Sequence, residues 1–434
     1  MAAPIVPVVE CPKVIRDYCD SFKDILATTA CYKSLVALVC AAAFGVANIS
    51  NIVRYFLFSP SVSAMCNFLG TPDLAGRLNR RHRRRLAALM AKARGAPQRY
   101  HYAIDDTLVD HSGKRIWGSY SWHDHSINSY INGHKILVIG LVDKKRNILI
   151  PLIWEVLHRD LSDKTNADSV AARVHEKAWQ VALRLLDTVI LEGLPKLALT
   201  ADSWFLGDDF CTALSVRDIP FVIELKSNRI VESHGKMTVK TSLIEFFKTR
   251  VRHLISFNHK TKYASEAVLR LRNTTHSVKV VAVANHRAID DAYFSYYACN
   301  QLTWDASKVW MHARGRWSIE VQFRELKQLF ALGEAAVRSK ESVEAAVSIS
   351  MIALTVIRLQ QLANADSSKN QYVRPISAGA IVRDLQFTSV NRSISKLALN
   401  PQMQTVKKFH SRYNQQNLNT KPAERFQMAE LKAG

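Results

Sequence analysis

The chain has 434 residues, 48% of them apolar, which is enough for several domains with hydrophobic cores. Lysine and arginine number 59 against 37 aspartates and glutamates, so the net charge is +22, and a chain this basic most often binds nucleic acid or another polyanion. The seven cysteines are scattered without a CxxC pair, which argues against a disulfide framework or a zinc finger and suits a reducing cytoplasm.

Residues 1–97 are expected to form an all-α domain, because apolar-periodic segments dominate and no alternating strand pattern occurs. The start of the chain lacks the pattern of a signal peptide. The apolar stretch 35–47 is too short to cross a bilayer, so we predict a buried helix and no membrane partner. The spacing of Ala41 and Gly45 allows a helix-turn-helix with residues 48–57 as its second helix; simple core packing is the alternative.

An arginine-rich run, RLNRRHRRRLAALMAKAR, covers residues 77–94. Six arginines within nine residues, with no acid in the run, repel one another unless a polyanion is near. We predict that the run contacts DNA, with Arg83, Arg84 and Arg85 as candidate phosphate ligands. A solvated helix face is the alternative, and the break at residues 95–97 ends the domain.

The remaining segments predict an α/β protein with a mixed sheet. Residues 98–228 contain several strands up to residue 156, a long helix over 168–190 and short strands at 196–205 and 221–228. Alternating strand patterns return in 229–303, which we expect to be a β-rich insertion, and residues 304–365 are helical. The segment 366–434 is polar and basic and is expected to be a C-terminal tail ordered at most by a partner.

Three aspartates adjoin apolar strand patterns: Asp105 and Asp106 are expected to end the strand YHYAI, and Asp202 the strand KLALTA. Aspartate is depleted in strands, and burying a carboxylate is costly unless it is paired or bound to a metal. Each aspartate by itself is more often a turn cap. Together they suggest that the chain builds a site of carboxylates.

A further acid, Glu320, lies in the segment RGRWSIEVQFRELKQLF (314–330). It is four residues after Arg316 and seven before Lys327, so on a helix the three side chains lie on nearly one face, beside an apolar stripe. Surface ion pairing would explain Glu320 alone. With the aspartates, it completes a set of three acids on two strands and a late helix, which can hold two divalent ions.

These motifs resemble those of DDE transposases of bacterial insertion sequences, in the group with a Y-x2-R-x3-E-x6-K signature and a β-strand insertion before the last acid. IDDT at 104–107 and TADSWF at 200–205 resemble the two aspartate motifs of the family, and Arg316, Glu320 and Lys327 supply R-x3-E-x6-K. The signature tyrosine is absent, because Ala313 stands in its place.

The resemblance implies an RNase H-like mixed sheet flanked by helices, interrupted by the insertion. It also implies that Asp105, Asp202 and Glu320 are catalytic and bind Mg²⁺, for which Mn²⁺ could substitute, and it favours Asp105 over Asp106 as the first acid. Arg316 and Lys327 would bind DNA. The implied activity is cleavage of transposon ends and joining of their 3′-hydroxyls to target DNA, by a homodimer acting on double-stranded DNA in the bacterial cytoplasm.

Two other functions fit the same residues: an end-binding repressor derived from a transposase, and an RNase H-like structure-specific nuclease. The motif WHDH places His123 and His125 on one strand face, but no further ligand has the spacing for a zinc site. No Walker A or GxGxxG motif occurs, so no nucleotide cofactor is expected.

Overall fold

The structure is a computed structural model that describes residues 8–92, 96–111, 113, 115–124, 127–157, 176–233, 239–257, 260–271, 277–287, 293, 295–367 and 376–399. The chain divides into two compact units, one formed by Met1–Leu78 with Leu326–Gly434 and the other by Asn79–Glu325. The sequence predicted a domain boundary near residue 97. In the structure the two units divide between Leu78 and Asn79, inside an arginine-rich helix that begins at Leu74.

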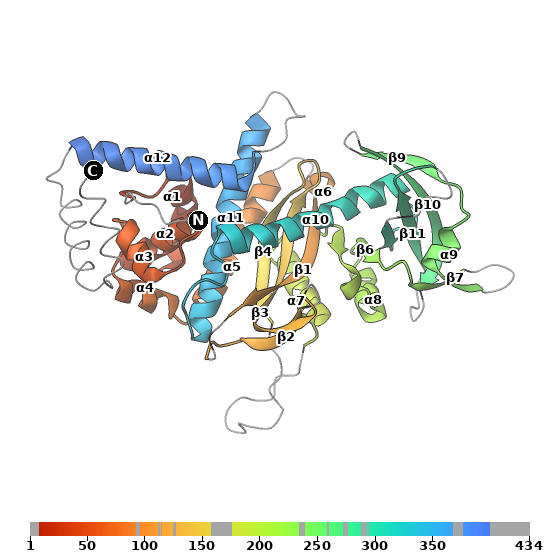
Figure 1. Ribbon diagram of the computed structural model, residues 1–434, viewed down its shortest axis with the longest axis horizontal. Coiled ribbons are helices and arrows are strands. Elements are labelled where there is room, and N and C mark those ends of the chain that lie inside the picture. Colours follow the sequence, from red (N-terminus) through yellow and green to blue (C-terminus); the bar gives the residue numbers. More distant parts are fainter. Residues whose placement is uncertain are drawn as a thin grey trace, which may run out of the picture. The chain divides into compact units, whose positions relative to one another are not determined.

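The described residues of the first unit form helices, with one isolated bridge between Val8 and Phe56. Side chains of Thr28, Asn48 and Ser61 accept hydrogen bonds from backbone N–H groups and so begin three of these helices. The elements, some labelled in Figure 1, are α1 (Lys13–Cys19), η1 (Asp20–Ile25), α2 (Thr29–Ala43), α3 (Ile49–Tyr55), α4 (Val62–Leu69), the start of α5 (Leu74–Lys92), the end of α10 (Ala306–Leu329), α11 (Lys340–Ser367) and α12 (Ala378–Leu399).

Helices α2 and α11 form the core of this unit. The side chains of α2 are buried from Ser34 to Ala43 and the helix packs against α11, so the buried helix expected at 35–47 is confirmed. Gly45 takes a φ of 73° in the turn to α3, a conformation that favours glycine. In α3 the buried residue is Ile52, whereas Asn51, where a helix-turn-helix would place an apolar side chain, is half-exposed.

Helix α11 is long and apolar enough to cross a membrane, but 78% of its most apolar window is buried inside the protein, as in a core helix. We expected residues 366–434 to be a tail ordered at most by a partner. Within that segment, Ala378–Leu399 instead form the helix α12. Ala378 and Val382 are buried, and Lys396 forms an ion pair with Glu10 at 2.7 Å. Residues 366–434 are polar on average, but within α12 a few apolar residues recur at helical spacing, and this stripe is sufficient to pack the helix against the protein.

The second unit is built on one mixed sheet, which contains 12 strands among the described residues. The strands are β1 (Tyr100–Asp110), β2 (Tyr120–Asp124), β3 (Ser129–Asp143), β4 (Ile148–Val156), β5 (Leu199–Ala201), β6 (Phe221–Leu225), β7 (Ile230–Ser233), β8 (Val239–Ser242), β9 (His253–Phe257), β10 (Lys260–Leu271), β11 (Ser277–Ala284) and β12 (Ser295–Cys299).

The order β2-β3-β1-β5-β6-β12-β11-β10-β7-β8, with β4 beside β3 and β9 beside β10, confirms the predicted mixed sheet. β3 is antiparallel to β1 and β4, whereas β1, β5 and β6 are parallel. The strands of residues 229–303 extend this same sheet, because β12 pairs antiparallel with β6. Their pairing satisfies backbone groups that would otherwise be unpaired along the edge of β6.

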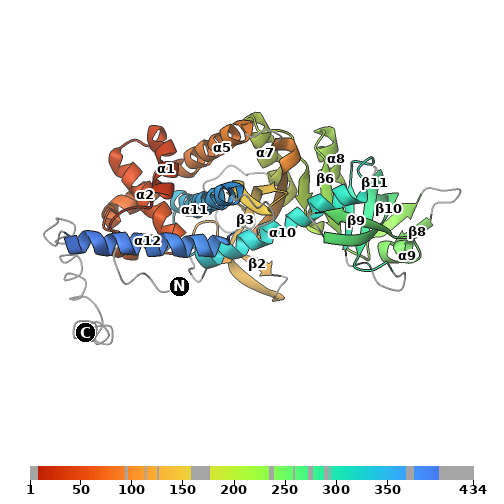
Figure 2. The same ribbon diagram turned by 90° about the horizontal axis from the view of Figure 1, so that it is seen from above.

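Helices flank this sheet, and Figures 1 and 2 show α10 lying along one of its faces. Its N-terminal half is anchored in a buried cluster in which Trp310 and Ala313 pack with Val222 of β6, Val281 of β11 and Cys299 of β12. The other helices are the rest of α5, α6 (Ala96–Arg99), α7 (Ala178–Leu191), η2 (Ser203–Phe205), α8 (Asp208–Val216) and α9 (Leu243–Phe247). Of the helix expected over 168–190, residues before 176 lie outside the described residues.

Candidate active site

The first two candidate acids lie inside β1 and not at its end, because the strand continues to Asp110. Its register with β3 is regular, so successive side chains alternate between the faces of the sheet. His101 packs against α10, at His312, with ring centroids 5.2 Å apart. Asp105 shares the face of His101, whereas Asp106 lies on the opposite face. The strand therefore presents Asp105 to α10.

Gly315 allows α10 to approach β1 this closely. A Cβ atom at this position would lie 2.1 Å from Cε1 of His101, in a ring that is fully buried. Burial holds the pKa of His101 well below its ordinary value, so the ring is neutral where the helix crosses it. The close crossing brings the next residue of α10, Arg316, within electrostatic reach of Asp105.

Asp202 directly follows β5, as expected from the sequence. The parallel register pairs Ala103 of β1 with Thr200 of β5. Asp105 and Asp202 each lie two residues further along, and the charge of Asp202 contributes to the raised pKa of Asp105. The Asp202 carboxylate accepts a hydrogen bond from the backbone N–H of Trp204 at 2.9 Å, which begins η2. Both aspartates are thus placed by backbone pairing.

The two neighbouring aspartates of β1 differ in how their charges are compensated. Burial raises the pKa of Asp105 to about 8, with further contributions from the charges of Asp202 and Asp106, and Arg316 opposes the shift. Burial also raises the pKa of Asp106, but Lys135 of β3 lies 3.0 Å from its carboxylate and opposes the shift. Asp105 faces α10 and Asp202, and among the described residues no cation lies at contact distance from it, which favours it as the first acid.

Arg316 connects the third candidate acid to the sheet. Its Nη1 donates to Glu320 at 2.7 Å, and its Nη2 lies 2.9 Å from Glu224 of β6. Burial lowers the pKa of Arg316, but the charges of Glu224 and Glu320 outweigh it, so the net shift is upward. Sequence reasoning missed Glu224, although an acid inside the apolar strand FVIEL is the same signal that identified Asp105.

The remaining positions of the signature lie along α10. Ala313 is buried in the cluster with Val222, so a tyrosine ring would not fit there without repacking. Lys327 is exposed, seven residues after Glu320, and belongs to the other compact unit.

The carboxylates fit a divalent metal only in part as they stand. Carboxylate oxygens are the ligands that hard divalent cations prefer, and a cation would relieve the repulsion that raises the pKa of Asp105 beside Asp202. Among the described residues, however, no three His, Cys, Asp or Glu side chains are grouped closely enough for a metal centre. Glu320 is bound to Arg316 instead, and would complete the site only by leaving it.

The structure corrects the prediction for Arg83. Its side chain is 7% exposed and forms a bidentate ion pair with Glu192 at 2.6 and 2.7 Å, so it is a structural residue. The neighbouring His82 is buried against Trp154 and hydrogen-bonded to the Pro151 carbonyl at 2.8 Å. Among the other residues of the arginine run, Arg80 and Arg84 are exposed, and Arg85 is partly exposed.

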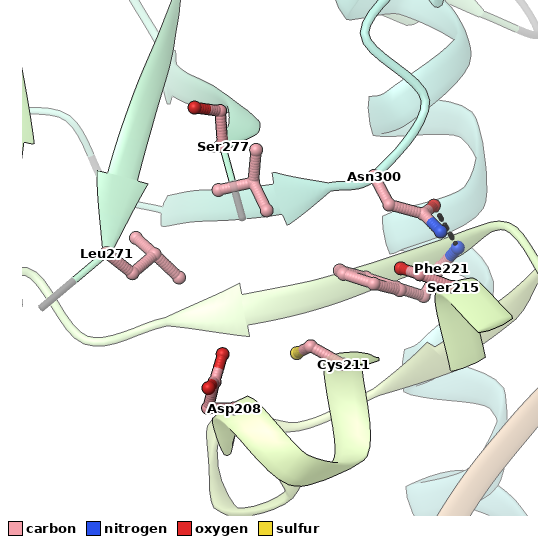
Figure 3. Close-up of a pocket in the computed structure, with 8 residues that line it drawn as sticks. Asp208, Cys211, Ser215, Phe221, Leu271, Ser277 and Asn300 are labelled. Carbon is pink, nitrogen blue, oxygen red and sulfur yellow. Dashed lines mark hydrogen bonds between the residues drawn. The ribbon is translucent and has the colours of Figure 1, made fainter. Parts of the chain in front are cut away.

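Two other regions share no residue with the acid site in the part of the chain that the structure describes. The His123 ring packs on Tyr130, and His125 lies outside the described residues. A cavity of about 190 Å³ opens on the face of β6 opposite to Glu224, and Figure 3 shows Asp208 and Cys211 of α8 facing Leu271 and Ser277 across it. Its lining residues are Asp208, Cys211, Ser215, Phe221, Leu271, Ser277, Val278 and Asn300.

Comparison with known families bears on the part of this site that lies on the sheet. Residues 52–242 match the family model described as DDE superfamily endonuclease. The matched segment is similar to DDE superfamily endonucleases and covers less than half of the chain. It contains Asp105, Asp202 and Glu224 and ends before Arg316 and Glu320. The match confirms, at the level of a DDE-type nuclease, the resemblance found in the sequence motifs. Enzymes of this superfamily generally use divalent metal ions.

Among solved structures, the chain is similar to a piggyBac transposase in a synaptic complex with hairpin DNA. The two share 11% sequence identity with a TM-score of 0.44, over 92% of this chain and 80% of that one, a likeness too distant to indicate function. No curated protein sequence matched the chain.

Proposed function

We propose that this chain is a DNA transposase that binds the inverted repeats at the ends of a mobile element, cleaves them and joins their 3′-hydroxyls to target DNA. The supporting observation is the placement of Asp105 and Asp202 beneath the helix that carries Arg316 and Glu320, within and directly after a DDE superfamily segment. The net charge of +22 suits a DNA partner.

The protein groups of this site have separate tasks in the proposed reaction. Asp105 and Asp202 would hold Mg²⁺ or Mn²⁺, and Glu320, once released from Arg316, would be a third ligand. Divalent ions bound to such carboxylates activate a water or hydroxyl and stabilise the leaving oxygen. Lys135 pairs with Asp106 and so offsets part of the negative charge beside Asp105. Arg316 binds a phosphate of the DNA beside the acids, and Lys327 supplies a further phosphate contact.

The test uses DNA duplexes that end in the inverted repeats found on either side of the coding region. Incubation with the full chain and Mg²⁺ should release ends with free 3′-hydroxyls and, with a supercoiled target plasmid added, produce joined products. Binding without cleavage in either Mg²⁺ or Mn²⁺ would identify a repressor. Cleavage of junctions or hybrids without joining would identify a structure-specific nuclease.

We further propose that two copies act together, because a mobile element has two ends to be cut and joined. Light scattering of the complex with the end duplex should give the mass of two chains and two duplexes. A stable complex of one chain and one duplex that performs joining would contradict the dimer.

A further inference from the structure

Arg316 lies between two glutamates from different elements. Glu320 is one turn further along α10, whereas Glu224 comes from β6. The Arg316 side chain is 15% exposed, and the Glu224 and Glu320 side chains are 33% and 35% exposed. Pairing with Glu320 on the same helix would by itself neutralise the charge of Arg316. The second ion pair, with Glu224 of the sheet, therefore calls for a separate explanation.

Glu224 is fixed in place by the sheet. It is paired in register with Tyr297 of β12, and it shares its face of β6 with Val222, which is buried in the same apolar cluster as Ala313 of α10. Burial raises the pKa of Tyr297, and the charge of Glu224 contributes to that shift. The glutamate therefore meets Arg316 from a rigid strand and not from a loop.

The geometry gives Glu320 two competing partners in the proposed reaction. It is bound to Arg316 in the structure. In the proposed function it would also be a third ligand of a divalent ion held by Asp105 and Asp202. A guanidinium has five N–H donors and can serve two carboxylates at once. With Glu224 in place, Arg316 keeps a charged partner when Glu320 departs, so no buried guanidinium is left unpaired.

We propose that Glu224 is a positioning residue that holds Arg316, so that Glu320 can be exchanged from the arginine to the metal ions. This inference rests on the proposed function of the acid site. Glu224 acts through Arg316 and is not itself a metal ligand. Without it, Arg316 binds Glu320 more strongly and the protein takes up the metal less readily, before any DNA or reaction is involved.

The test measures binding of Mn²⁺ to the full chain without DNA, by the loss of the free-ion signal in electron paramagnetic resonance. Glu224→Gln should weaken Mn²⁺ binding roughly 3- to 10-fold, the size of coupling typical of residues in contact. Glu232→Gln is the matched control, because Glu232 is also a strand acid with a cationic partner, Lys240 at 3.4 Å, and it should bind Mn²⁺ as the wild type does. Melting temperatures of both variants check folding.

A second pair of variants separates positioning from direct ligation. In an Arg316→Gln background, Glu224→Gln should change Mn²⁺ affinity less than twofold, because the residue through which it acts is gone. An equal loss with and without Arg316 would overturn the proposal by making Glu224 a metal ligand, and no loss in either background would also overturn it. Asp105→Asn is the reference: if it leaves Mn²⁺ binding unchanged, the metal site of the proposed function fails, independently of Glu224.

Discussion

Helices α5 and α10 each bury an arginine against glutamate, and the two arrangements differ in what surrounds them. Arg83 gives both of its hydrogen bonds to one carboxylate, that of Glu192. Arg316 divides its bonds between Glu224 and Glu320, and its charge also reaches Asp105, whose pKa is raised to about 8. The first pair is complete by itself and serves the fold. The second places one cation among three carboxyl groups, an arrangement more typical of functional sites than of structural ion pairs.

The largest expected effect comes from the glutamate partners of the two arginines. Glu320→Gln should lower DNA cleavage roughly 10³-fold or more, because a proposed metal ligand is lost, with little change in melting temperature. Glu192→Gln should lower the melting temperature and leave cleavage per folded molecule unchanged. Both variants are assayed on the same end duplexes at a temperature where each is folded. Near-normal cleavage by Glu320→Gln would reduce its pairing with Arg316 to an ordinary helix ion pair.

The next effect distinguishes the buried arginine of α5 from an exposed one. Arg83→Ala leaves Glu192 partly buried without its partner and should destabilise the protein by about 3–5 kcal/mol. Arg84→Ala should leave stability unchanged and, if Arg84 contacts a phosphate, lower the slope of log affinity against log salt by about 0.9. Chemical denaturation and salt titrations of DNA binding measure the two quantities. An Arg84 variant with an unchanged slope would make the exposed side of the run a solvated face.

The exposed cation of α10 should behave differently from its acids. Lys327→Ala removes one proposed phosphate contact, so we expect weaker binding of the end duplex and reduced cleavage that recovers at low salt or high protein concentration. Glu320→Gln should not recover under either condition, because its defect is in the chemistry. Cleavage rates at two salt concentrations separate the variants. A loss in Lys327→Ala that is independent of salt would contradict a role in DNA binding.

The smallest expected effect is a gain in stability. The raised pKa of Asp105 means that the folded chain binds a proton more tightly than the unfolded chain, so stability falls as pH rises from about 4 to about 8. Asp105→Asn removes this cost and should raise the melting temperature by a few degrees at pH 7, with the gain vanishing near pH 4. The measurement is a series of thermal melts without metal. An equal melting temperature at pH 7 would show that the Asp105 carboxylate is not destabilised in the fold.

The sequence by itself determined the parts of this protein that depend on local order. The apolar strands, the buried helix α2 and the position of Asp202 after β5 follow from periodicity and composition over a few residues. The spacing of Arg316, Glu320 and Lys327 follows from the helix repeat. The order of these motifs along the chain was enough to recognise a DDE-type nuclease.

Only the tertiary structure decided which charges are paired with which. In the sequence, Arg83 and Arg84 are neighbouring arginines of one basic run and cannot be told apart. In the structure only Arg83 pairs with Glu192, which lies 109 residues after it. Asp105 differs from Asp106 because it lies on the face of β1 that α10 crosses. Glu224 pairs with Arg316 because β6 packs against the same helix. The strands after residue 229 joined the main sheet through β12. Pairing between distant segments depends on where the backbone brings them, and no local periodicity carries that information.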